Sequence, residues 1–313
     1  MSSLLQSVDA RTRLAGTNKL EMLLFSLGTD SRTGRRETFG INVFKVREVL
    51  RRPPITRTPD LPPGVEGMVS LRSQLTAVVN LARYVHVDTE TRAEILIITE
   101  YNGHSQAFLV EGVDTILRLD WSRMKVPPDM LAAEMGGMVT AVTELDDGRI
   151  VMMLDVERIL SETTQIDDQL LFRSIKPLEC PDKTVFFADD SSVARKQIER
   201  TLDALQVRHS SAINGGKAWV ELCRIADYAD ARKVGVNSLI QLIITDVEMP
   251  EMDGYMLTRK IKSDPRFAGI PVLMHSSLSG QSNQKHGLNN GVDEYIPKFE
   301  PQRFAEIVTR YLA

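Results

Sequence analysis

The spacing of hydrophobic residues changes near residue 165. Before this point, apolar residues form short runs or alternate with polar ones, as between Phe39 and Val43, and glycine, proline and aspartate separate the runs. Alternation at a period of two is typical of β-strands that bury one face. The first half therefore predicts many short strands in an all-β sandwich or barrel.

Two predicted hairpins support this interpretation. One joins the apolar segments 94–99 and 106–110 through Asn102-Gly103, and the other turns at Asp147-Gly148. These residue pairs tolerate the positive φ angles that tight hairpin turns require. Five prolines between positions 53 and 63 exclude a long helix from the connection there.

The second half alternates between apolar strands and segments with helical spacing. Strands are predicted at 184–188, 239–244, 271–274 and 294–297, and helices at 192–205, 218–229 and 255–262. Continuous apolar strands separated by helices predict a parallel sheet covered on both faces, which is a doubly wound α/β domain. We therefore predict a first domain at 19–165, a polar linker at 166–182 and a second domain at 183–313.

The composition suits two soluble globular domains, with 313 residues, 42% of them hydrophobic and 26% charged. The net charge of −4 offers no basic face for nucleic acid, and the pairs Arg35-Arg36 and Arg51-Arg52 are predicted to be solvated surface. No apolar run approaches the roughly 18 residues of a membrane span, and no secretory signal begins the chain. Only two cysteines, Cys180 and Cys223, occur, which suits a reducing, cytoplasmic compartment.

Acidic residues end two of the strands predicted for the second domain. Asp189 and Asp190 follow the strand at 184–188 and Asp246 follows the strand at 239–244, and these strands are neighbours in a doubly wound sheet. Three converging carboxylates repel one another unless a cation lies among them. Mg²⁺ prefers such oxygen ligands, and a carboxylate beside it can attack a phosphoryl group.

Two further side chains are predicted at the same sheet edge. Ser276 follows the strand at 271–274 and would donate its hydroxyl to a phosphoryl oxygen, while Lys298 follows the strand at 294–297 and would supply a positive charge. Each residue also fits an ordinary structural role: Asp190 or Ser191 could cap the next helix, and Lys298 could be solvated. Four separate strands would each place a carboxylate, a hydroxyl or an ammonium group at the same sheet edge, and this coincidence favours a phosphoryl-transfer site over the separate structural roles.

Residues 183–313 resemble the receiver domain of two-component response regulators, which has a five-stranded parallel sheet. The matching motifs are Asp189-Asp190, the run from Asp246 to Gly254, Ser276-Ser277, and Tyr295-Ile296-Pro297-Lys298. The resemblance implies that Asp246 is the phosphoacceptor and that Ser276 and Lys298 bind the phosphoryl group. It also implies that Tyr295 moves on activation. The Mg²⁺ ligands that it implies are Asp189, Asp190, Asp246 and the backbone carbonyl of Glu248. One departure is Phe299, where the family usually has a proline after the lysine.

The first domain shows no nucleophile and base at catalytic spacing and no glycine-rich phosphate loop, which indicates a binding module and not an enzyme. It resembles the CheW-type coupling domain of bacterial chemotaxis in the segments Phe39-Gly40-Ile41, Val46 to Val49, Pro63 to Arg72, Ala77 to Leu81, 109–113 and 150–155. The resemblance implies paired small β-barrels. Arg72 is the best single candidate for a partner-binding residue, and the alternative is that it is an ordinary solvated arginine. Ser73 stands where that family commonly has glycine.

A coupling domain followed by a receiver is the layout of CheV-type chemotaxis proteins. This layout implies a cytoplasmic adaptor at receptor arrays on the inner face of the membrane, which links chemoreceptors to a histidine kinase and is regulated by phosphorylation. It would bind no nucleic acid and catalyse at most its own phosphoryl transfer and dephosphorylation. Two alternatives are a phosphate sink that drains the kinase and, less favoured, a receiver-regulated enzyme or transcription regulator.

Overall fold

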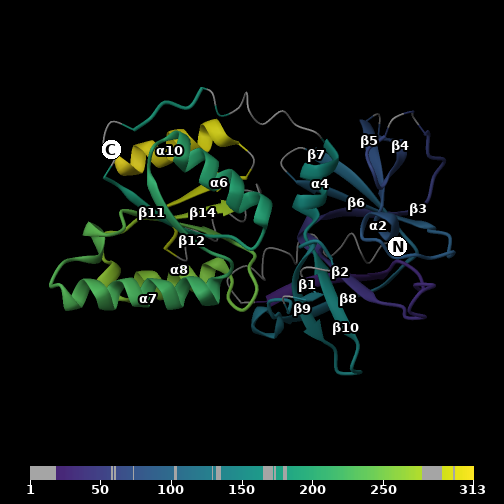
Figure 1. Ribbon diagram of the computed structural model, residues 1–313, viewed down its shortest axis with the longest axis horizontal. Helices are drawn as coiled ribbons and strands as arrows, with labels where there is room; N and C mark the ends of the chain where they lie inside the picture. Colours follow the sequence, from purple (N-terminus) through teal and green to yellow (C-terminus); the bar gives the residue numbers. More distant parts are fainter. Residues whose placement is uncertain are drawn as a thin grey trace. The chain divides into compact units, whose positions relative to one another are not determined.

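The chain divides into two compact units, Leu20–Gln165 and Ile166–Ala313 (Figure 1). The computed structural model describes residues 19–57, 59, 61–72, 74–101, 104–128, 130–131, 135–164, 172, 174–178, 182–276, 291–298 and 300–313. Ser73, the Asn102-Gly103 turn, Cys180, Ser277 and Phe299 lie outside these residues, as does most of the predicted linker.

The first unit contains two five-stranded sheets, ordered β8-β1-β2-β10-β9 and β3-β6-β7-β5-β4. The strands are β1 (Lys19–Ser26), β2 (Thr38–Asn42), β3 (Val46–Arg51), β4 (Val65–Leu71), β5 (Gln74–Asn80), β6 (Ile95–Tyr101), β7 (His104–Val110), β8 (Gly112–Asp120), β9 (Val139–Glu144) and β10 (Ile150–Leu154). The helical segments are η2 (Val43–Lys45), α2 (Leu81–Tyr84), η3 (Trp121–Arg123) and α4 (Val156–Thr164). The predicted all-β class is confirmed.

Each sheet of the first unit has its own apolar core. Leu20, Met22 and Leu24 alternate along β1 and pack in the core of the first sheet, as their period of two requires. Leu96 and Ile98 do the same on β6 in the second sheet. Both predicted hairpins form as antiparallel pairs, β6 with β7 and β9 with β10, and Gly148 takes the positive φ of +83° at the second turn.

The second unit is a parallel five-stranded sheet in the order β12-β11-β13-β14-β15. Its strands are β11 (Thr184–Ala188), β12 (Arg208–Ala212), β13 (Leu242–Asp246), β14 (Val272–Ser276) and β15 (Glu294–Pro297). Its helices are α6 (Ser192–Ala204), α7 (Gly215–Ala231), α8 (Gly254–Ser263) and α10 (Pro301–Leu312), with η4 (Val236–Ser238) and η5 (Pro265–Phe267) between them. The doubly wound α/β prediction is confirmed.

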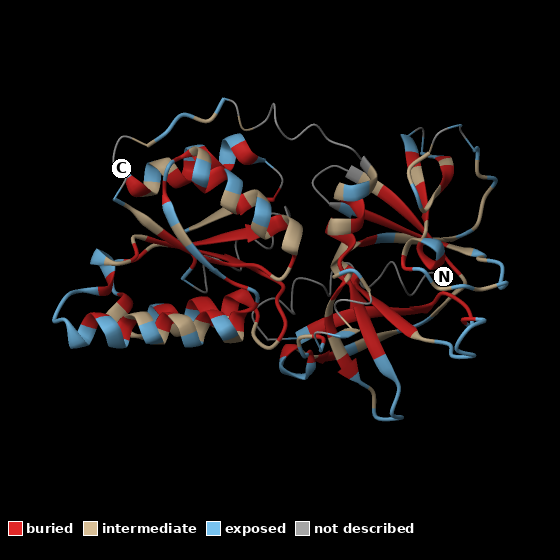
Figure 2. Cartoon of the chain, in the orientation of Figure 1, coloured by how far each residue is buried: buried red, intermediate tan, exposed pale blue. Residues whose placement is uncertain are grey.

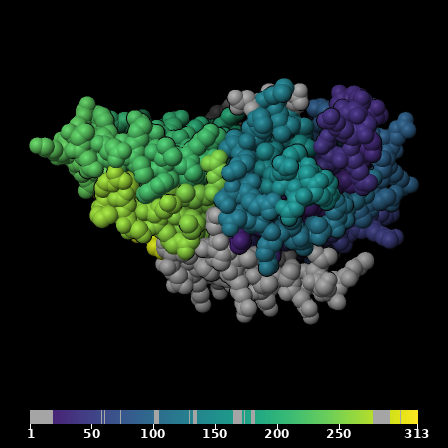
Figure 3. Space-filling view, turned by 90° about the horizontal axis from the view of Figure 1, so that it is seen from below, coloured from purple at the N-terminus to yellow at the C-terminus, as the bar shows by residue number. Residues whose placement is uncertain are grey.

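Helices cover both faces of this sheet. The helices α6 and α10 pack on one face and α7 and α8 on the other, each over a separate apolar core (Figure 1). Buried strands therefore lie between helices whose outer faces are exposed (Figure 2). Figure 3 shows the side of this unit that α7 and α8 form, in green and yellow-green.

Two elements of the second unit begin three residues away from their predicted starts. Strand β13 begins at Leu242 and not at Leu239, because Leu239 is the C-terminal cap of the 3-10 turn η4. The side-chain Oε1 of Gln241 accepts a hydrogen bond from the backbone N–H of Thr184 (2.7 Å). Helix α7 begins at Gly215, three residues earlier than Ala218, because the Asn214 side chain caps it by accepting from the Lys217 N–H (2.7 Å).

Candidate functional site

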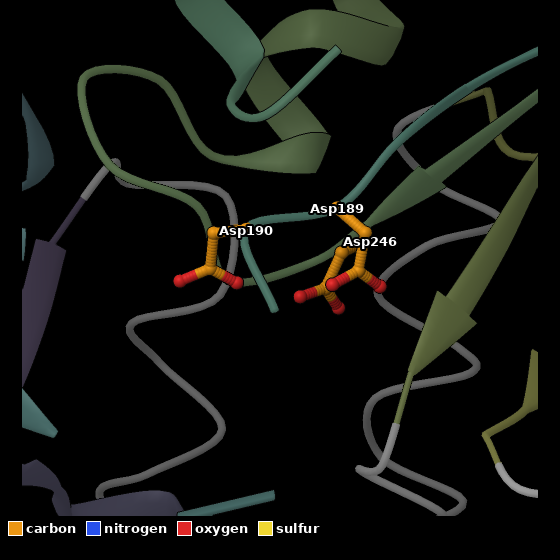
Figure 4. Close-up of side chains that lie close together, drawn as sticks. All are labelled: Asp189, Asp190 and Asp246. Atoms are coloured by element: carbon orange, nitrogen blue, oxygen red, sulfur yellow. The ribbon is translucent and has the colours of Figure 1, made fainter. Parts of the chain in front are cut away.

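Strands β11 and β13 are hydrogen-bonded neighbours, so their carboxyl ends meet at one edge of the sheet. Ala188 pairs with Thr245, which places the next residues, Asp189 and Asp246, side by side. Asp190 completes a group whose carboxylate oxygens lie within 4.8 Å of one another. The three side chains point from the strand ends toward a common space (Figure 4). The structure thus brings the three predicted carboxylates together.

Lys298 extends into this group from the end of β15. Its Nζ lies 2.9 Å from Oδ2 of Asp189 and 3.1 Å from Oδ2 of Asp246, and the side chain is only 1% exposed. The backbone N–H of Lys298 donates to the carbonyl of Ser276 (3.1 Å), which holds the end of β15 beside β14. Although Pro297 precedes the lysine, this backbone brings its ammonium to the carboxylates. Lys298 is a buried charge and not a solvated surface residue.

Asp189 is ionised in this arrangement. Complete burial disfavours its charged form, but the ammonium of Lys298 and, next, the His275 side chain hold the pKa of Asp189 below its usual value. His275 lies on β14 with Nδ1 3.9 Å from Oδ2 of Asp189, and its ring packs edge-on against Phe304 of α10. His275 was not among the predicted site residues. A histidine inside an otherwise apolar buried strand was the available signal.

The loop after β11 fixes the acidic pair. Oδ1 of Asp189 accepts a hydrogen bond from the Ser191 N–H (2.9 Å), and Arg195 donates to the backbone carbonyls of Asp189 (2.8 Å) and Asp190 (2.9 Å). The cap of α6 is Ser191, whose Oγ accepts from the Ala194 N–H. Because Ser191 supplies the cap, Asp190 is not needed for it.

The loop after β13 approaches the site closely. Glu248 is buried in this loop, and Asp253 caps α8 by accepting from the Met256 N–H (2.6 Å). A Cβ added to Gly254 would lie 2.0 Å from the carbonyl oxygen of Asp246, so only glycine fits there. Asp253-Gly254 therefore fixes the backbone of Asp246, whereas the role of the Glu248 carbonyl stays a prediction.

Ser276 and Tyr295 lie at the same edge of the sheet. Ser276 ends β14 and is 3% exposed. Tyr295 on β15 is half-buried, and its hydroxyl donates to the hydroxyl of Tyr255 on α8 (2.8 Å). Burial and the neighbouring Tyr255 raise the pKa of Tyr295 above its usual range, so its hydroxyl stays protonated as a donor. Tyr255 was not predicted, and its pairing is visible only in the fold.

The residues present fit a magnesium ion. The donor set consists of carboxylate oxygens, the ligands that Mg²⁺ prefers. Three carboxylates and one ammonium leave two net negative charges, which a divalent cation offsets. Part of this charge is buried, where an uncompensated charge is costly.

Arg72, the candidate binding residue of the first unit, lies in the turn between β4 and β5. Its side chain is 67% exposed and pairs with Glu48 of β3 at 3.0 Å. Its φ of +48° is uncommon for a residue with a side chain. The structure therefore presents Arg72 at the surface, held by a partner that the sequence analysis did not name, and its binding role stays a prediction.

Comparisons with known proteins agree with this division of the chain. Residues 21–164 match the model of the CheW-like domain, and residues 185–310 match that of the response regulator receiver domain. The chain is 30% identical to the chemotaxis protein CheV3 of Helicobacter pylori over 280 residues, covering 88% of each chain. It is 26% identical to CheV1 of the same organism over 100% of this chain and 99% of that one.

Among solved structures, the scaffolding protein TtCheW from Thermoanaerobacter tengcongensis is similar to 44% of this chain and 84% of its own, with 22% identity and a TM-score of 0.39. Among the helices of the described residues, none has the length and apolar character needed to cross a membrane.

Proposed function

We propose that phosphorylation of Asp246 regulates this protein. The chain belongs to the CheV family of chemotaxis proteins, in which a CheW-like domain precedes a receiver domain, and it is therefore an adaptor of chemotaxis signalling. In this proposal the CheW-like domain couples chemoreceptors to a histidine kinase, at receptor arrays on the cytoplasmic side of the membrane. The observation that supports the phosphorylation step is the group of three carboxylates, two of which Lys298 contacts.

The proposed chemistry follows from the positions of the side chains. An oxygen of the Asp246 carboxylate attacks the phosphorus of the donor, and the bond between phosphorus and the donor breaks, which leaves an acyl phosphate on Asp246. Lys298 then pairs with a phosphoryl oxygen in place of Oδ2 of Asp246, and the Ser276 hydroxyl donates to another. Asp189, Asp190, Asp246 and the Glu248 carbonyl would hold Mg²⁺, which when bound offsets the charge of the phosphoryl oxygens.

The proposed signal leaves the site through Ser276 and Tyr295. A hydroxyl drawn toward the phosphoryl group moves the end of β14, next to which Tyr295 packs against Val247 and Met274. The hydrogen bond between Tyr295 and Tyr255 can then exchange for another arrangement, so that the two states present different surfaces. The only chemistry we propose for the protein is gain and loss of its own phosphoryl group.

Replacing Asp190 by asparagine should weaken Mg²⁺ binding but leave the fold nearly intact. The substitution removes one negative charge from the site, whereas the cap of α6 belongs to Ser191. Titration of Mg²⁺ monitored by the intrinsic fluorescence or amide resonances of the protein measures the affinity, and thermal unfolding measures the stability. Ser191→Ala is the matched control, expected to lower the stability of the domain by about 0.5–2 kcal/mol. An unchanged Mg²⁺ titration in Asp190→Asn would contradict the metal role.

The fragment of residues 1–164 is expected to fold alone and to co-sediment with receptor–kinase arrays, because the first unit has its own two sheets and cores. Phosphorylation of the full chain should change this binding by about 5- to 150-fold, the usual range of coupling between sites. Asp246→Asn should remove the response. A fragment that does not bind refutes the coupling role, and equal binding in both states would restore the phosphate sink as the function.

A further inference from the structure

A cleft of about 500 Å³ opens at one end of the second sheet of the CheW-like domain. Its walls come from the end of β3, the start of β4, the end of β7, α2 and the segment 87–93. Arg72 follows the opposite end of β4, about 20 Å from Glu66 along the strand at ~3.3 Å per residue. The cleft is thus separate from the predicted binding residue, and the phosphoacceptor belongs to the other unit.

A buried carboxylate, Glu66, lines the cleft together with two of the three arginines that surround it, Arg52 and Arg83. Glu66 is only 6% exposed, and it lies 2.6 Å from Arg57, 3.0 Å from Arg83 and 3.8 Å from Arg52. Burial opposes its charged form, but the hydrogen bond from Arg57 and the charges of Arg83 and Arg52 hold the pKa of Glu66 below its usual value. One negative charge therefore lies among three positive charges, and two of these, on Arg52 and Arg83, line the cleft.

Arg52 and Arg83 have donors to spare. The Arg52 side chain is 24% exposed, and besides its 3.8 Å contact with Glu66 it donates to the Ala93 carbonyl (3.3 Å). Arg83 makes a single hydrogen bond to Glu66 through Nη1. A guanidinium has five N–H donors in a planar fork that matches a carboxylate. The prediction that Arg51-Arg52 is solvated surface is therefore wrong for Arg52, which lines the cleft and contacts Glu66 and the Ala93 carbonyl.

The rest of the lining narrows the class of ligand. Asp88, Glu90 and Glu111 also line the cleft and would repel a polyanion, although Glu111 is paired with Arg36 at 2.9 Å. The described lining contains no aromatic ring on which a nucleotide base could stack. A volume of this size lies within the range of about 300–1,000 Å³ for ligand sites and is far larger than one small anion needs.

We propose that this cleft is a second docking point of the adaptor, which binds an acidic side chain on an exposed segment of a partner protein. The partner's carboxylate pairs with the guanidinium groups of Arg52 and Arg83, and its backbone occupies the remaining volume. The other acidic residues of the lining, such as Asp88 and Glu90, favour a segment with a single carboxylate over a nucleotide or an acidic run.

Arg57 provides a matched control for this proposal. Arg57 and Arg83 both pair with Glu66 and are 71% and 67% exposed, but only Arg83 lines the cleft. Loss of either arginine removes one ion pair from Glu66. Only loss of Arg83 removes a guanidinium from the cleft itself.

The test titrates the ¹⁵N-labelled full chain with the capped peptide acetyl-Gly-Glu-Gly-amide, with its glutamine counterpart, and with inorganic phosphate and AMP. We expect the glutamate peptide to shift the resonances of Arg52, Arg83 and Ala93. Its Kd should rise at least tenfold in Arg83→Gln and stay within about twofold in Arg57→Gln, because only Arg83 presents its guanidinium to the cleft.

Four results would overturn the proposal: no shifts at these residues with the glutamate peptide, equal shifts with the glutamine peptide, equal loss of binding in both variants, or tighter binding of phosphate or AMP. If Arg83→Gln unfolds the domain, Arg83→Lys keeps the charge beside Glu66 but loses the planar fork. The Kd of the glutamate peptide is then compared between Arg83→Lys and Arg57→Lys, and only Arg83→Lys is expected to raise it.

Discussion

Asp246→Asn is expected to reduce phosphorylation of the protein to background, a loss on the order of a hundred-fold or more, because a neutral amide is a poor nucleophile toward phosphorus. The substitution nearly preserves the shape of the side chain, and Lys298 keeps its contact with Asp189 at 2.9 Å. The fold should therefore survive. Incubation with acetyl phosphate or a phosphorylated kinase in Mg²⁺, followed by intact-mass spectrometry, measures the incorporation.

Asp227→Asn serves as the control for this experiment. Asp227 is an exposed aspartate of the same domain that pairs with Arg266 at 2.8 Å, far from any predicted role in phosphoryl transfer. Its substitution changes the net charge of the domain by the same amount and should leave incorporation unchanged. Label that persists at the wild-type level in Asp246→Asn would show that another residue accepts the phosphoryl group.

The main elements of the receiver domain could be predicted because their burial is nearly uniform. Every residue of β13 and β14 is buried, and both strands begin with three consecutive apolar residues. Polar residues at the ends of such runs have few structural explanations, which made Asp189, Asp190 and Asp246 conspicuous. The parallel topology then determined that these ends share one edge.

Elements whose character depends on tertiary contacts escaped prediction. Edge strand β12 has the sequence Arg-His-Ser-Ser-Ala with only Ala212 buried, so its apolar signal is too weak to identify a strand. Helix α4 directly follows β10, and its side chains are held by residues distant in sequence, such as Lys45 with Glu157 at 3.1 Å. Such pairings cannot be inferred from local periodicity.

Arginine pairing in the CheW-like domain is a second example. Glu48 and Arg72 are 24 residues apart and Glu66 draws arginines from both flanking segments, yet in the sequence each of these residues looks like ordinary surface charge. The sequence shows which side chains are acidic or basic, but not which of them lie together in the fold. The proposed docking cleft therefore emerges only from the fold, whereas the phosphoacceptor site was visible in the strand pattern.

Removal of the Lys298 ammonium should have the largest effect on stability. Lys298→Met leaves Asp189 and Asp246 buried without the cation that lies 2.9 and 3.1 Å from them. Breaking a buried ion pair on one side typically costs about 3–5 kcal/mol, because the remaining charge is uncompensated. We expect a loss of this size in the free energy of unfolding of the receiver domain at neutral pH without Mg²⁺, measured by urea denaturation.

Mg²⁺ should reverse part of this loss, because the three carboxylates then have a cation again and a ligand that binds only the folded state stabilises it. The stabilisation by a fixed Mg²⁺ concentration is therefore expected to be greater in Lys298→Met than in the wild type, where the ammonium already offsets one charge. Lys217→Met, which removes an exposed lysine of α7, should behave like the wild type in both conditions. If Lys298→Met is as stable as the wild type without Mg²⁺, or gains no more from the ion, then Lys298 does not compensate the charge of the site.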